Sequence, residues 1–190
     1  MVEFMQISTG QKAERSIKGA IIAVFIAGVR RWNPGAIVNA VIGFAAAYLP
    51  DIIERQYDIK FQPWQRVYTG IAMLMHAVGM LGPYDDTWWW DHITHTLSAS
   101  LLGGAVHVAA QRCGRDPQRS VLTAIVGGGV LWEVMEYAIH GLTDRLDLEP
   151  VLIPYSARDT IVDLFFNLLG ALLVLLFGDR LLQNFIQDTD

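Results

Sequence analysis

Cysteine and lysine are rare in this sequence, and charged residues are scarce as a class. Cys113 is the only cysteine, so no disulfide can form within the chain. It follows Arg112 in a polar connection, where a free thiol is typical of the reducing, cytoplasmic side. Charged residues make up 17 % of the 190 residues, whereas an average soluble domain has about 25 %. This composition argues against a soluble domain, and the net charge of −5 gives no reason to expect nucleic acid as a partner.

Apolar residues are abundant instead, at 53 %, and they fall in long blocks. A bilayer core of about 30 Å needs roughly 20 residues of helix. We therefore predict an all-α fold, a polytopic bundle of about six spans that forms a single transmembrane domain over residues 1–190. The polar stretches 51–62, 111–119 and 142–157 are expected to be loops. The predicted spans cover about residues 16–31, 36–50, 64–82, 88–110, 120–141 and 159–178.

The first apolar stretch lacks a signal-peptide cleavage site. It follows Lys12, Arg15 and Lys18, as in a signal peptide, but it runs into Arg30-Arg31-Trp32 without a small-residue cleavage site. We expect it to be retained, either as a full span or as a helix lying in the membrane interface. Elsewhere, Gly103-Gly104 and Gly127-Gly128-Gly129 predict close packing between helices.

Basic residues are distributed unevenly between the two predicted sides. Six spans place both termini on one side, which then holds ten basic residues, while the other side holds four. By the positive-inside rule, this places both termini in the cytoplasm of a protein of the plasma membrane. The first set is Lys12, Arg15, Lys18, Arg55, Lys60, Arg66, Arg112, Arg115, Arg119 and Arg180, and the second is Arg30, Arg31, Arg145 and Arg158.

Ionisable side chains interrupt the last three predicted spans, where they are costly and by default suggest a functional site. In each group the spacing is helical, at three or four residues, so that most members share a face. All three groups fall near the extracytoplasmic ends of their spans, which predicts one shared polar site. The groups are Asp91, His92 and His95; Glu133, Glu136 and His140; and Asp159, Asp163 and Asn167.

Carboxylates and imidazoles from facing helices are the ligands that helical bundles use to bind metal ions. Their mixed nitrogen and oxygen chemistry suits Zn, Mn or Fe without choosing among them. As catalytic groups we expect Glu133, Glu136 and Asp163. As metal ligands we expect Asp91, His92, His95, Glu133, Glu136, Asp159 and Asp163.

A structural interpretation stands beside the metal site. The same side chains can pair with one another only to hold the bundle together, and Arg158 next to Asp159 is a candidate pair. Taken singly, His76, His107 and His140 are typical of packed or interfacial histidines. Asp85 and Asp86 are typical of a solvated turn.

Three ordered segments resemble a known family of membrane proteins. Trp89-Trp90-Asp91-His92-Ile93-Thr94-His95-Thr96-Leu97-Ser98 resembles a Trp-Trp-Asp-x-x-x-His-x-x-Ser stretch of the YjdF-like inner-membrane proteins, and Trp132-Glu133-Val134-Met135-Glu136 and Asp159-Thr160-Ile161-Val162-Asp163-Leu164 resemble its other two motifs. Asn167 departs from that pattern, where an acidic residue is expected. Arg158-x4-Asp163-x3-Asn167-x2-Gly170 is also similar to the C-terminal signature of VanZ-like membrane proteins. Both resemblances imply a small polytopic protein with clustered polar residues and no particular activity.

We predict a metal-dependent membrane enzyme, a hydrolase or lipid-modifying enzyme that acts on a lipid or isoprenoid head group, with membrane lipid as its partner. The sequence shows no nucleophilic triad and no glycine-rich phosphate loop. The first alternative is a small transporter or ion-binding protein, which the apolar inner halves of the last three spans disfavour. The second is a non-catalytic partner protein whose polar cluster is structural. The substrate, the metal and a homo-oligomeric state are left open.

Overall fold

The computed structural model describes residues 9–57, 59–148, 151–152 and 156–186. Throughout these residues the regular structure is helical and no strand is present, so the predicted all-α fold is confirmed. The helices are α1 (Thr9–Arg30), α2 (Pro34–Ala46), α3 (Leu49–Tyr57), α4 (Pro63–Gly79), α5 (Pro83–Asp86), α6 (Trp90–Arg112), α7 (Pro117–Arg145), α8 (Ala157–Leu181) and α9 (Gln183–Ile186).

Short polar side chains set where three of the long helices begin. Asn33 accepts a hydrogen bond from the Ala36 amide at the start of α2, and Ser156 accepts one from the Asp159 amide at the start of α8. Asp116 caps α7 in the same way, directly before Pro117. Such caps satisfy amide groups that a helix leaves without partners, and proline fits the first helical position. The predicted breaks between spans at these points therefore lie next to observed helix starts.

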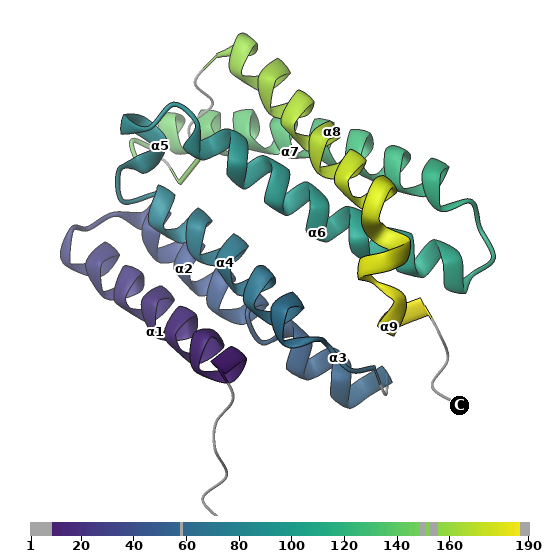
Figure 1. Cartoon of the computed structure of the whole chain (residues 1–190). Helices are drawn as coiled ribbons and strands as arrows, with labels where there is room; N and C mark the ends of the chain where they lie inside the picture. Colours follow the sequence, from purple (N-terminus) through teal and green to yellow (C-terminus); the bar gives the residue numbers. More distant parts are fainter. Residues whose placement is uncertain (1–8, 58, 149–150, 153–155, 187–190) are drawn as a thin grey trace, which may run out of the picture.

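The long helices form two groups of three, which Figure 1 shows side by side. Helices α1, α2 and α4 pack on one another, and so do α6, α7 and α8, while α4 contacts α6 and joins the groups. Each group has its own apolar core. Ile21, Val24 and Ala40 belong to the first core, and Val121, Ile125 and Val174 to the second. The boundary between the groups is consequently a place where a cavity can form.

Close approach between α6 and α8 depends on Gly170. A Cβ atom at this position would lie 2.8 Å from the Ala99 Cβ atom and would also meet the Thr96 carbonyl oxygen. The expected packing role of the other glycines is mixed. Gly129 faces Leu164 and Asn167 of α8, whereas a Cβ atom at Gly127 would have no neighbour within 4 Å. A small residue in a span is therefore not always a packing residue.

Large apolar side chains cover the outside of the molecule. On α8 alone, Leu172, Leu173, Leu176 and Phe177 are exposed, and Leu176 is 64 % exposed. A continuous apolar exterior of this kind is what a helix presents to lipid, since a soluble protein rarely exposes such a patch. Within the described residues, three helical stretches are long and apolar enough to cross a membrane, namely Pro34–Tyr57, Pro117–Arg145 and Ala157–Leu181.

The predicted boundaries need two corrections, and the count of six spans stays a prediction. Residues 51–57 are helical in α3 instead of forming a loop, and α7 continues to Arg145 instead of ending at residue 141. α4 has 17 residues, about one turn fewer than the roughly 20 residues that a membrane span needs. α1 carries charges at Lys12, Glu14, Arg15 and Lys18. These two helices cross a bilayer only if their ends lie in the interface.

A network of ion pairs explains why the polar stretch after residue 50 is helical. Asp51 and Glu54 lie one turn apart on α3, and both accept hydrogen bonds from the Arg66 guanidinium, at 2.7 Å and 2.5 Å. Glu14 of α1 lies 3.4 Å from the same guanidinium and pairs with Lys18 at 2.6 Å. The two acidic residues of α3 thus face a partner on α4, so their polarity marks one face of a helix.

Candidate functional site

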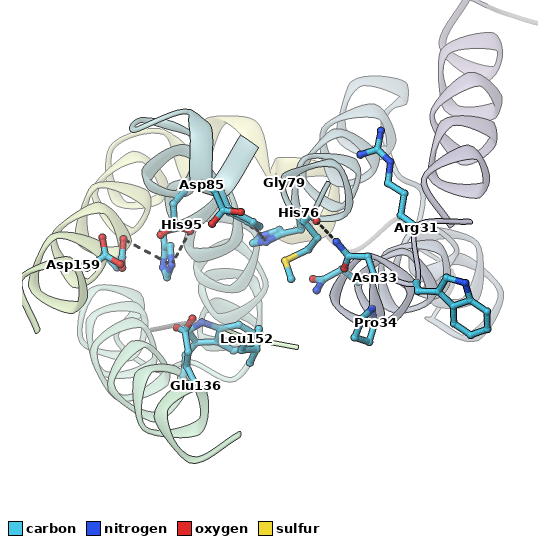
Figure 2. A pocket seen from close by; sticks show the side chains of 17 residues that line it. Arg31, Asn33, Pro34, His76, Gly79, Asp85, His95, Glu136, Leu152 and Asp159 are labelled. Carbon is cyan, nitrogen blue, oxygen red and sulfur yellow. Dashed lines mark hydrogen bonds and ion pairs between the residues drawn. The ribbon is translucent and has the colours of Figure 1, made fainter. Parts of the chain in front are cut away.

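A cavity of about 500 Å³ lies between the two helix groups, at the end of the molecule opposite the Arg66 network. Its volume falls in the range of small-molecule sites, roughly 300–1,000 Å³. Figure 2 shows Arg31 and Asn33 on one side of it, Glu136 and Asp159 on the other, and His76 and His95 between. Acidic side chains dominate its polar lining, which includes Asp85, Asp91, Glu136, Asp159 and Asp163.

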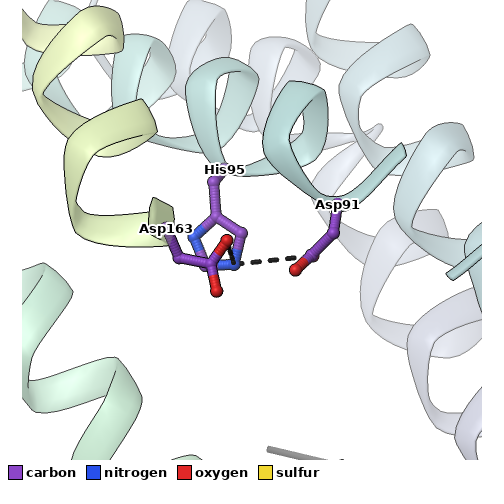
Figure 3. Close-up of side chains that lie close together, drawn as sticks. All are labelled: Asp91, His95 and Asp163. Carbon is purple, nitrogen blue, oxygen red and sulfur yellow. Dashed lines mark ion pairs between the residues drawn. The ribbon is translucent and has the colours of Figure 1, made fainter. Parts of the chain in front are cut away.

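Three side chains converge within this cavity: Asp91 and His95 of α6 and Asp163 of α8 (Figure 3). One ligand atom from each lies within 4.8 Å of the others. His95 Nε2 is 3.5 Å from Asp91 Oδ1 and 3.9 Å from Asp163 Oδ1. The first two residues are one helical turn apart, and the close contact of α6 with α8 at Gly170 brings in the third.

The Asp163 carboxylate is almost fully buried, at 3 % exposure, and its Oδ1 atom has no hydrogen-bond partner. Its nearest nitrogen atoms are His92 Nδ1 at 3.6 Å and His95 Nε2 at 3.9 Å, both beyond hydrogen-bond length. His92 Nδ1 is itself buried without a partner. Because a buried carboxylate oxygen is costly when nothing satisfies it, this arrangement fits a cation held among the three residues.

Neighbouring residues fix the orientation of both imidazoles. His95 Nδ1 lies 3.3 Å from Asn167 Oδ1, an acceptor that selects the tautomer with the proton on Nδ1. The lone pair of His95 Nε2 then faces Asp91 and Asp163, as a metal ligand requires. The His92 ring stacks on Phe166, with centroids 4.6 Å apart and planes within 6°. Asn167, which departs from the YjdF-like pattern, thus contacts the cluster directly.

The remaining predicted site residues are placed unequally. Glu136 of α7 and Asp159 of α8 line the same cavity, outside the three-residue cluster. Glu133 is buried, at 6 % exposure, with its Oε1 atom unpartnered, but it is not among the residues lining this cavity. Asp91 and Asp163 are therefore close enough to share an ion with His95. Glu136 and Asp159 face the same cavity but lie outside this cluster.

A chain of hydrogen bonds on the α4 side of the cavity was not predicted from the sequence. His76 Nε2 lies 2.6 Å from Ser98 Oγ, and His76 Nδ1 lies 2.8 Å from the Tyr84 hydroxyl. Burial raises the pKa of Tyr84, which keeps the phenol protonated and able to donate. The expected turn at residues 83–86 is a one-turn helix, α5, that carries Tyr84 into the cavity. The sequence signal that could have identified Tyr84 was its position directly after Gly82-Pro83.

Other histidines and charged residues have separate environments. His107 lies at the opposite end of α6, where its Nε2 atom is 3.0 Å from Asp179 Oδ1. Arg158 is exposed, and no ion pair joins it to Asp159 in the described part of the chain, so the expected structural pair is absent there. Asp85 is exposed, as expected of a solvated residue, and it also lines the cavity.

One carboxylate from α8 and a carboxylate and an imidazole from α6 form a set of three donors. Catalytic metal sites commonly use three protein ligands and keep a further position for water or substrate. The open cavity beside the cluster leaves room for such a group.

Comparison with known proteins places the chain at the level of a family. The model of the family described as "Predicted membrane protein (DUF2238)" matches residues 13–184, which include every residue of the site. No curated protein and no solved structure matches the chain.

Proposed function

We propose that this chain, which belongs to the DUF2238 family of predicted membrane proteins, is a metal-dependent membrane enzyme that acts on the head group of a lipid or isoprenoid. The observation that carries the proposal is the Asp163 Oδ1 atom, which is buried without a hydrogen bond and faces two imidazoles beyond hydrogen-bond distance. A structural network would close these gaps with hydrogen bonds. The YjdF-like and VanZ-like resemblances remain finer predictions within this family assignment.

Asp91, His95 and Asp163 are the proposed metal ligands, with His92 beside them. The donor set of nitrogen and oxygen atoms suits Zn, Mn or Fe. Asp159 lines the cavity next to these ligands and is a candidate for additional coordination. With both termini in the cytoplasm, the cavity opens near the extracytoplasmic face of the plasma membrane.

A bound divalent cation would supply a Lewis acid for a phosphoryl or carbonyl oxygen. Glu136 faces the same cavity from α7 and is placed to accept a proton from an attacking water molecule. The water oxygen bonds to the phosphorus or carbonyl carbon, and the bond to the leaving oxygen breaks. Glu136 then returns the proton to that oxygen, so the overall reaction consumes one water molecule.

The test is the metal content of the full chain, purified in mild detergent and offered Zn²⁺, Mn²⁺ and Fe²⁺. We expect about one equivalent of one metal in the wild type by elemental mass spectrometry, in line with a single cluster of ligands. His95→Ala and Asp163→Asn should lose it. His107→Ala, on the same helix but at the far end, should retain it. A folded wild type without metal would falsify the proposal.

A second measurement separates metal binding from catalysis. Vesicles containing phosphatidic acid, phosphatidylglycerol and farnesyl phosphate are incubated with the metal-loaded protein, and the lipids are analysed by mass spectrometry. Glu136→Gln should keep the metal and lose head-group turnover, because the amide cannot accept the proton. Equal turnover by Glu136→Gln and the wild type would remove Glu136 from the catalytic role.

A further inference from the structure

A second cavity, of about 310 Å³, lies beside the first between the two helix groups. Four residues line both cavities: Asn39, His76, His95 and Trp132. The two cavities are therefore adjacent, and His95 stands at the boundary between them. The carboxylates of the first cavity do not line the second, whose remaining walls are largely apolar side chains and glycine backbone.

The walls of the second cavity come from both helix groups. Ile42 of α2, Leu102 of α6 and Ile125 of α7 line it. Ile125 is buried, at 2 % exposure, whereas Ile42 is 60 % exposed and also reaches the lipid-facing surface. Gly128 widens the space from the α7 side, since a Cβ atom there would meet only Leu102 Cδ2, at 3.5 Å.

We propose that this second cavity binds an acyl chain of a phospholipid whose head group lies at the Asp91–His95–Asp163 cluster. An apolar space next to an acidic polar one matches the two halves of an amphiphile. The lipid enters sideways from the bilayer, because Ile42 lines the cavity and also faces the membrane. The surrounding bilayer supplies acyl chains at that position. The inference rests on the proposed function for what the head group meets.

A leucine at position 128 fills the cavity without disturbing the fold, because its Cβ atom makes an ordinary van der Waals contact. Gly127→Leu is the matched control. It makes the same chemical change one residue away on α7, where a Cβ atom would have no neighbour within 4 Å, and Gly127 does not line the cavity. Both variants replace glycine by a better helix former, so effects on helix propensity are equal.

The experiment uses the full chain in phosphatidylcholine nanodiscs containing phosphatidic acid with a diazirine in mid-chain. After illumination, cross-linked residues are mapped by peptide mass spectrometry. We expect an adduct on Ile125 in the wild type and in Gly127→Leu, and its loss in Gly128→Leu. Labelling of Leu176, which faces outward on α8, should be equal in all three proteins. A parallel sample carries a diazirine on farnesyl phosphate.

Adducts confined to outward residues, or an Ile125 adduct that survives in Gly128→Leu, overturn the inference. Labelling of Ile125 by the farnesyl probe alone overturns the assignment to an acyl chain. Metal content is measured on the same samples, which separates the two proposals. Metal without the Ile125 adduct defeats the tail site only, whereas the adduct without metal supports the tail site and defeats the metal-dependent enzyme.

Discussion

At the scale of single residues, the candidate site depends on groups that orient the proposed ligands as much as on the ligands themselves. Asn167 accepts from His95 Nδ1, and Phe166 stacks on the His92 ring. Both lie on α8 near Asp163, so a single helix supplies one proposed ligand and the supports for two imidazoles. Such supporting contacts typically hold a metal ligand in one tautomer and one orientation.

Replacing Asn167 by leucine should weaken metal binding by about 10- to 100-fold, the usual effect of losing a supporting hydrogen bond. The leucine fills similar space but accepts no hydrogen bond, so His95 loses the contact that selects its tautomer. Asn167→Asp should retain affinity, since a carboxylate accepts from Nδ1 as well. Zn²⁺ titration by calorimetry on purified protein measures both. Unchanged affinity in Asn167→Leu would show that His95 does not bind the metal through Nε2.

At the scale of the helix, the contact between α6 and α8 positions Asp163 against Asp91 and His95. Gly170→Val should lower stability by about 1–3 kcal/mol, the usual cost of overpacking, because the new side chain meets Ala99 and the Thr96 carbonyl. Gly127→Val is the control, with open space at its Cβ atom. Thermal unfolding in detergent compares the two, and equal melting temperatures would contradict the packing role of Gly170.

The Arg66 network gives a prediction for how α1, α3 and α4 hold together. Arg66→Met removes the cation that Asp51 and Glu54 share, leaves Asp51 paired only with Lys18 at 3.2 Å, and should cost about 1–3 kcal/mol. Adding Asp51→Asn and Glu54→Gln to the same chain should recover part of that loss, because the unpaired charges are then gone. Unfolding free energies of the single, double and triple variants measure the coupling. Additive losses would mean that the pairs contribute nothing jointly.

Much of the helix arrangement could be predicted from sequence, and the exceptions have a physical cause. Hydrophobic blocks and the residues at Asn33, Asp116 and Ser156 locate most long helices. Helix α3 was wrongly predicted as a loop because its acidic side chains, Asp51 and Glu54, face Arg66. Arg66 lies 12 residues beyond Glu54, and local hydropathy does not reveal such a partner. Amphipathic spacing alone is ambiguous when the polar face is covered by another helix.

Only the part of the candidate site that depends on spacing within one helix was predictable from the sequence. Spacing along α6 and α8 pointed to Asp91, His95 and Asp163, which lie together. It could not separate Glu133 from Glu136, since only the rotation of α7 against its neighbours decides which carboxylate lines the cavity. The hydrogen bond between Tyr84 and His76 was not predicted because it joins two elements, and periodicity within one helix carries no such information.

At the scale of the whole molecule, the two ends differ in chemistry. One end holds the acidic cavity, and the other holds the Arg66 network together with the ends of α6 and α8, where Arg112 donates to the Phe185 carbonyl. The two-group architecture places the adjacent cavities between the groups, and Ala99 and Ile125 of the second core line the smaller cavity. Once one end of the molecule is assigned to a side of the membrane, the side from which the acidic cavity is reached is also known.

The orientation can be tested with the cysteine that the chain already has. Cys113 is exposed, in the connection between α6 and α7, and basic residues predict that this connection is cytoplasmic. A membrane-impermeant maleimide should therefore label Cys113 only after cells are lysed. In a Cys113→Ser background, Leu146→Cys at the opposite end of α7, where Leu146 is exposed, should be labelled in intact spheroplasts. The reverse pattern would turn the molecule over and place the acidic cavity on the cytoplasmic side. Labelling of both positions in intact cells would show that α7 does not separate two compartments.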